Sequence, residues 1–202
     1  MSDTPSIRAF MAQSILQAAR TLQEAQQQRI FERVSPEVVS LITLSPKAAW
    51  VPLAQSSKLT DAVHEELGSQ KFRQLFTEVA RDALKYPLLR KFFDAAIRLL
   101  GLSPSSLLKW SVHAWEYSFQ GCGKLVFRLI REDDSGGEVE MVLEGLPPEF
   151  MRSGTFVESL AGTFESFLTQ ASREGRVDIP SRFPKAGHVV YRVSWKQAAG
   201  AG

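Results

Sequence analysis

The sequence predicts an α+β protein in which N-terminal helices pack on a small antiparallel sheet made of a hairpin, a helix and two strands. Apolar residues recur at spacings of three and four from residue 4 to residue 119, which is typical of amphipathic helices. After Gly123 the period changes to two, which is typical of strands with one buried face. The helical period returns once, at residues 155–168, before two further strands.

The composition is that of an ordinary globular domain. Of the 202 residues, 44% are hydrophobic and 23% are charged, which is enough for one core without covalent staples. The 24 Lys and Arg against 22 Asp and Glu give a net charge of +2, without the clustered cations that a nucleic-acid partner requires. The lone cysteine excludes an internal disulfide and suits a reducing compartment. With no secretory signal and no stretch of about 18 apolar residues, we expect a cytoplasmic protein without an integral membrane segment.

Residues 1–33 are predicted to form an N-terminal helix, because Thr4-Pro5 is a typical helix start and an apolar seam follows it. The main side chains of this seam are Met11, Ile15 and Leu22. Its narrow face leaves three alternatives open: packing on the body of the chain, contact with a partner protein or a second copy, or a frayed arm. Residues 34–197 are predicted to form a single α+β domain, and residues 198–202 a frayed tail.

Glycine and proline divide the rest of the helical half. The stretch 48–57 is expected to be irregular and is a candidate for a functional loop. Gly68 separates two helices, and Ser103-Pro104 begins the last helix before the sheet. Residues 88–100 are apolar over more than half of the helix circumference, which predicts the central buried helix.

The second half begins with a β-hairpin. Residues 125–130 and 138–144 alternate in polarity around turn residues 133–137. The hairpin glutamates are expected to face water opposite Arg128, rather than to form an acid–base site; they are Glu138, Glu140 and Glu144.

Thr155 and Glu158 are spaced as a capping box, which predicts the start of the inserted helix. A short strand at residues 177–179, a loop at 180–187 and a final strand at 189–195 complete the predicted order.

The sequence carries no motif for catalysis, metal binding or cofactor binding. His64, His113 and His188 fall on different predicted elements, and none has a second His or Cys three or four residues away. A phosphate-binding glycine loop and a Gly-x-Ser-x-Gly elbow are both missing. Cys122, flanked by two glycines, either fills a small space or is an exposed, modifiable thiol. We therefore predict no metal, no cofactor and no catalytic residue.

Several short segments carry a resemblance to known proteins: Trp50-Val51-Pro52-Leu53, Pro87-Leu88-Leu89-Arg90, Leu100-Gly101-Leu102-Ser103-Pro104, Trp115 through Gly121-Cys122-Gly123, and Gly162-Thr163-Phe164-Glu165. Together they resemble a myxobacterial family of unknown function and of similar length. The likeness covers residues 34–196. These segments are structural rather than catalytic, so the resemblance bears on fold more than on function.

That family is distantly similar to the superfamily of haem-dependent nitric-oxide sensors, vinyl-reductase ligand-binding domains and TRAPP vesicle-tethering subunits. The resemblance implies helices followed by an antiparallel sheet with an inserted helix, and a role in binding a small or apolar ligand or in assembly. Haem is not implied, because the sensors use a Tyr-x-Ser-x-Arg motif and a proximal histidine. Tyr191-Arg192-Val193-Ser194-Trp195 lacks that spacing and its arginine.

The leading hypothesis is a non-enzymatic sensory or adaptor domain that binds a partner protein or a small apolar ligand. The walls of a ligand pocket are predicted from aromatic residues, which would equally well fill a solid core: Phe92, Phe93, Trp110, Trp115, Phe127, Phe164 and Tyr191. The alternative is a structural dimerisation or scaffold protein that acts through the N-terminal helix. A third hypothesis is an enzyme with a composite site at His113 and Cys122.

Overall fold

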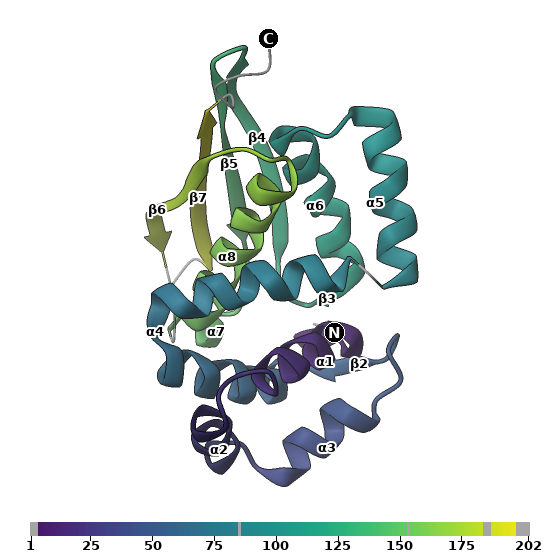
Figure 1. Cartoon of the computed structure of the whole chain (residues 1–202), viewed down its shortest axis with the longest axis vertical. Helices are drawn as coiled ribbons and strands as arrows, with labels where there is room; N and C mark the ends of the chain where they lie inside the picture. The colour runs from purple at the N-terminus through teal and green to yellow at the C-terminus, as the bar shows by residue number, and fades with distance from the viewer. Residues whose placement is uncertain (1–3, 85, 153, 184–186, 197–202) are drawn as a thin grey trace.

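The computed structural model describes residues 4–84, 86–152, 154–183 and 187–196 (Figure 1). The helices are α1 (Ala9–Ala19), α2 (Glu24–Arg33), α3 (Pro36–Leu44), α4 (Leu53–Ala83), α5 (Pro87–Leu100), α6 (Pro104–Ser118), α7 (Pro148–Arg152) and α8 (Thr155–Gln170). The strands are β1 (Ser6–Arg8), β2 (Trp50–Pro52), β3 (Phe119–Gln120), β4 (Lys124–Asp133), β5 (Gly136–Glu144), β6 (Gly175–Phe183) and β7 (His188–Lys196). Helices and antiparallel strands in this order confirm the predicted α+β class.

Four strands form an antiparallel sheet in the order β4–β5–β7–β6, and β4 with β5 is the predicted hairpin. Helices α6 and α8 pack against this sheet (Figure 1). The hairpin glutamates form cross-strand ion pairs: Arg192 lies 3.2 Å from Glu138 and 3.3 Å from Glu140, and Arg128 lies 3.5 Å from Glu144. The charged face of the hairpin is therefore a paired, partly exposed surface rather than an acid–base site.

A second small sheet, in the order β2–β1–β3, joins three segments that are far apart in the sequence. Its central strand places Ile7 opposite Val51 on one side and Phe119 on the other. Because residues 6–8 pair as a strand, the first helix begins at Ala9, and the helix start predicted at Thr4-Pro5 is wrong. The single helix predicted over residues 1–33 is wrong too, since α1 ends at Ala19 and α2 begins at Glu24 after a turn. The sheet fixes residues 6–8 beside the start of α4 and the end of α6.

Helix α4 contacts both α1 and α8, so it links the helical half to the sheet half (Figure 1). It bends at Gly68, whose backbone has φ 69° and ψ 163°, which agrees with the predicted division into two helices. The stretch 48–57, expected to be irregular, instead contains β2 and the first turns of α4. Pairing with β1 orders residues 50–52 as a strand, and α4 begins directly after it.

Helix α5 is not the central helix that its composition predicted. It lies at the outer edge of the molecule beside α6 (Figure 1). The side chains of Arg90, Lys91, Asp94 and Arg98 are exposed. These charged residues form a solvent-facing stripe, so an edge position suits the helix better than the interior.

Two further predictions about the second half are wrong. Strand β6 extends into the predicted loop, and a shift of its pairing between Asp178 and Ser181 accommodates Pro180 on this edge strand. The predicted capping box is absent, since Gly154 occupies the N-cap position of α8 and Glu158 pairs with Arg73 instead. Residues 198–202, the predicted tail, lie outside the described residues. None of the helices in the described ranges is long and apolar enough to cross a bilayer.

Candidate functional site

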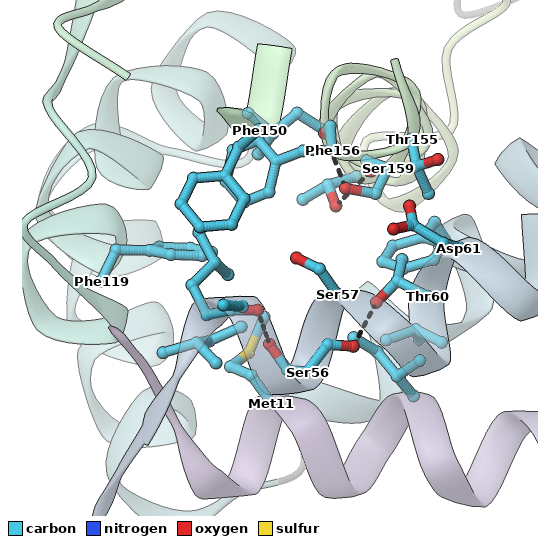
Figure 2. A pocket seen from close by; sticks show the side chains of 18 of the residues that line it. Met11, Ser56, Ser57, Thr60, Asp61, Phe119, Phe150, Thr155, Phe156 and Ser159 are labelled. Atoms are coloured by element: carbon cyan, nitrogen blue, oxygen red, sulfur yellow. Dashed lines mark hydrogen bonds between the residues drawn. The ribbon is translucent and has the colours of Figure 1, made fainter. Parts of the chain in front are cut away.

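A pocket of about 280 Å³ opens between α4 and α8, at the place where α1, β3 and α7 also meet (Figure 2). Most of its lining is apolar and comes from both halves of the chain: Ile7, Met11, Ile15, Leu53, Ala54, Phe76, Val79, Ala80, Phe119, Phe150, Phe156 and Leu160. A cavity of this kind is the usual place for a small ligand.

Two stripes of polar side chains face each other across the pocket. One comes from α4, where Ser57 and Asp61 are four residues apart. The other comes from α8, where Thr155, Ser159 and Thr163 follow at intervals of four. Side chains at this spacing lie on one helix face, so each helix presents a polar row at the edge of an apolar cavity.

Most hydroxyl protons of the pocket lining are already used in hydrogen bonds. Ser56 and Thr60 each donate to a backbone carbonyl of α4 at 3.1 Å. Ser159 and Thr163 donate to carbonyls of α8 at 2.8 and 2.9 Å. A hydroxyl that has donated its one proton retains acceptor lone pairs, so these oxygens can only accept further hydrogen bonds in this arrangement.

Asp61 is the half-buried carboxylate of the pocket. Burial raises its pKa, and a hydrogen bond from the Thr155 hydroxyl opposes that rise. The nearby charges are those of Glu65, which also raises the pKa, and His64, which lowers it. Asp61 forms no ion pair with any of the described residues, so no basic side chain contacts its carboxylate at the pocket.

An aromatic wall stands across the pocket from Asp61 (Figure 2). The Phe156 ring meets Phe119 edge to face at 5.8 Å and lies 6.5 Å from Phe150, measured between ring centroids. Phe119 in turn stacks on Trp115 at 4.2 Å. Such mutual contacts hold the rings in place and make the wall a preformed apolar surface.

None of the predicted pocket residues whose side chains the structure describes lines this pocket. Trp110, Trp115 and Phe164 line a smaller cavity of about 70 Å³, which shares Phe119 and Leu160 with the main pocket.

Phe93, Phe127 and Tyr191 line neither of these two cavities. Phe93 meets Trp110 edge to face at 5.5 Å, and Tyr191 is buried against Phe164 at 5.1 Å. Phe127 is half-buried in β4, and the side chain of Phe92 lies outside the described part of the chain.

The N-terminal seam faces the body of the chain. Met11 and Ile15 line the pocket, and Ile15 is only 5% exposed. Leu22 is partly buried against the same core. The seam therefore packs within the chain, and a partner contact through it stays a prediction.

The proposed composite site at His113 and Cys122 is not assembled. His113 is exposed on α6, 3.8 Å from Glu116. Cys122 is 1% exposed, with its thiol 3.2 Å from the carbonyl of Gln120 and 3.7 Å from that of Ser6. Burial raises the pKa of this thiol to about 11, which disfavours the reactive thiolate.

Sequence reasoning missed the residues that define the pocket. Phe119, Phe150 and Phe156 were not among the predicted walls, and Asp61 carried no motif. The four-residue spacing of the hydroxyl side chains along residues 155–163 was a usable signal, because it marks a polar row beside an apolar stripe.

The pocket does not fit a haem. Haem iron in proteins is held by His, Cys or Tyr, or by Met paired with His, and Met11 is the one residue of these types that lines either cavity among the described residues. The histidines lie elsewhere: His64 is 3.2 Å from Ser69 on α4, and His113 is on the surface. In the described ranges no group of three or more His, Cys, Asp or Glu is placed to hold a metal ion.

No known protein-family model matches the chain, and no curated protein matches its sequence. The resemblance to the myxobacterial family therefore stays a prediction.

Solved structures of H-NOX domains do match its fold. An Fe(II) unliganded H-NOX mutant from K. algicida gives a TM-score of 0.62 at 6% identity, over 96% of this chain and 98% of that one. A Tt H-NOX double mutant gives 0.58 at 13% identity, over 94% of each chain. An oxygen-binding H-NOX domain related to soluble guanylate cyclases, in its oxygen complex, gives 0.51 at 16% identity, also over 94% of each. The chain thus has the fold of H-NOX domains over nearly its whole described length, built around a pocket whose described residues do not suit a haem.

Proposed function

We propose that this protein is a non-enzymatic sensory domain that binds a small, largely apolar ligand in the pocket between α4 and α8. The observation that carries the proposal is the pocket itself, an apolar cavity of about 280 Å³ lined by both halves of the chain. Pockets for drug-sized ligands span about 300–1,000 Å³, so a smaller ligand is expected. The H-NOX fold supports a ligand-binding role, since one of the similar structures is an oxygen-binding domain.

The position of the pocket suits a sensor. Helices α1, α4 and α8 each contribute to its lining and also pack on one another or on the sheet. A ligand shifts a conformational equilibrium when it binds one arrangement of such elements better than another. In this proposal the protein acts in the cytoplasm and passes the bound state to a partner protein.

The proposal is tested by titration with the neutral fluorescent probe N-phenyl-1-naphthylamine. We expect saturable binding of one probe molecule per chain. The Ser57 hydroxyl points toward the open middle of the pocket (Figure 2), so Ser57→Phe places a ring there. This variant should weaken probe binding by about tenfold or more, equivalent to about 1.4 kcal/mol.

The matched control is Ser40→Phe, which adds the same ring at an exposed position of α3 outside the pocket. It should bind the probe like the wild type. Absence of saturable binding to the wild type, or equal binding by Ser57→Phe, would show that the cavity is not a ligand site.

A further inference from the structure

The charges that line the pocket are acidic. Asp61 and Glu149 are both lining residues, and none of the described lining residues is Lys, Arg or His. Partly buried carboxylates elsewhere in the fold are paired: Arg73 contacts Glu158 and lies 3.3 Å from Glu165. Asp61 has no such partner in the described ranges. A cavity whose charged groups share one sign attracts ligands of the opposite sign.

The hydrogen-bonding capacity around Asp61 is also one-sided. The hydroxyls of Ser56, Thr60, Ser159 and Thr163 have donated their protons to backbone carbonyls. The hydroxyl of Thr155 is committed to Asp61 itself. Among the described hydroxyls of the rim, the one at Ser57 still has a proton to donate, and it points into the open middle of the pocket (Figure 2). The other oxygens accept, so a ligand that engages them must supply donors.

The rest of the cavity calls for an apolar group. The rings of Phe119 and Phe150 lie on one side of the pocket and Asp61 on the opposite side (Figure 2). A ligand that spans the cavity therefore meets aromatic carbon at one end and a carboxylate with acceptor oxygens at the other.

We infer that the pocket takes a small amphiphilic amine, whose ammonium group donates to Asp61 and the neighbouring hydroxyl oxygens while its apolar body packs on the phenylalanine wall. An ammonium group supplies three donors and a positive charge, which matches both features of the rim. The inference rests on the proposed function, because it assigns a ligand class to the same pocket.

The test compares three probes of similar size by isothermal titration calorimetry at pH 7: phenethylamine, 2-phenylethanol and 3-phenylpropionate. An alkylammonium with a pKa like that of Lys, about 10.4, is fully charged at this pH. A charge-assisted hydrogen bond favours the amine, so we expect it to bind about tenfold or more tightly than the alcohol. The anionic acid should bind more weakly than either.

The second test repeats the calorimetry with the variant Asp61→Asn. Asparagine keeps the shape of the side chain and an acceptor for the Thr155 hydroxyl, but removes the negative charge. We expect it to reduce phenethylamine affinity to the level of 2-phenylethanol and to leave the alcohol unchanged. The control, Asp94→Asn, removes the same charge from the exposed face of α5 and should change neither affinity.

These outcomes distinguish the assignment of an amine from the proposal that the pocket binds a ligand at all. The comparison of the three probes uses the wild-type protein, so it does not depend on whether a variant folds. Equal or tighter binding of the alcohol or the acid overturns the amine assignment while leaving the pocket a ligand site. Binding of N-phenyl-1-naphthylamine without binding of phenethylamine overturns it in the same way. If no probe binds, the proposed function fails as well.

Discussion

At Asp61 the fold retains a carboxylate that burial makes costly. Burial raises the pKa of Asp61 in the folded chain above its value in the unfolded chain, so the folded chain binds the carboxyl proton more tightly. The free energy of unfolding therefore falls as the pH rises from the unfolded-state pKa through the folded-state pKa. Asp61→Asn removes this cost. We expect its free energy of unfolding at pH 7 to exceed that of the wild type by less than about 1 kcal/mol, because solvent screens a half-buried charge. Urea unfolding at pH 7 measures the difference.

The difference should vanish well below the ordinary Asp pKa of about 3.9, where both states carry the proton. Asp133→Asn is the control of opposite sign, since hydrogen bonds from Ser135 lower the pKa of Asp133. Removing that carboxylate should reduce stability at neutral pH rather than increase it. A less stable Asp61→Asn variant at pH 7 contradicts the account of Asp61 as an unpaired charge.

The Cys122 thiol is expected to react slowly in the folded protein. With the thiol buried and its pKa raised to about 11, Ellman's reagent at pH 8 should react with the native protein only as fast as the chain opens. Addition of denaturant should make the reaction fast and stoichiometric. Rapid labelling of the native chain would instead support the alternative suggested by the flanking glycines, in which the Cys122 thiol is exposed and modifiable.

Single residues show how far the sequence alone could lead. The spacing of Thr155, Ser159 and Thr163 was visible in the sequence, but their partner across the cavity was not. Asp61 lies on another helix, and only the packing of α4 on α8 brings it opposite that row. Whether Cys122 was exposed or buried also depended on β1, which covers it from more than a hundred residues away in sequence.

At the level of elements, the close contact of α4 with α8 depends on a glycine, Gly162, which has no Cβ atom. A Cβ atom on Gly162 would lie 2.5 Å from the carbonyl oxygen of Arg73 and 2.9 Å from Cβ of Phe76. The Thr77 hydroxyl also donates to the Gly162 carbonyl at 3.1 Å. The close approach leaves no room for a methyl group, so the two helices must separate to admit one.

Gly162→Ala should therefore lower the free energy of unfolding by about 1–3 kcal/mol, the usual cost of overpacking, although alanine favours helix. Denaturant titration measures this loss. The control is Thr169→Ala on the exposed side of α8, which should stay within about 0.5 kcal/mol of the wild type. A Gly162→Ala variant as stable as the wild type would mean that the helices do not meet here.

Local sequence patterns predicted most of the helices and strands, but not which of them pack or pair with one another. The hairpin and the last strand followed from alternation, and the bend at Gly68 from its glycine. The errors came where tertiary pairing overrode a local pattern. Residues 6–8 satisfied helix-start rules yet pair with two distant strands, and Glu158 bonds Arg73 rather than its own helix end.

For the whole molecule, the sequence suggested a cavity among the aromatic residues near the sheet, whereas the pocket of about 280 Å³ lies where the two halves meet. Its lining draws on β1, α1, α4, β3, α7 and α8. A pocket made by so many elements depends on their relative placement, which no periodicity encodes. Because these elements come from both halves of the chain, a ligand in the pocket contacts both halves at once. We therefore expect a bound ligand to increase the stability of the whole fold.

Occupancy of the pocket should thus stabilise the entire fold. At a free concentration of about 100 times its Kd, N-phenyl-1-naphthylamine should raise the free energy of unfolding by about 2.7 kcal/mol, provided that it binds the folded state alone. The urea dependence should keep its slope, since the surface exposed on unfolding barely changes. Hydrogen exchange should slow together in α1, α4 and α8, and Ser57→Phe should show no such gain. Protection confined to one of these helices would mean that the probe binds a local surface and not the junction of the two halves.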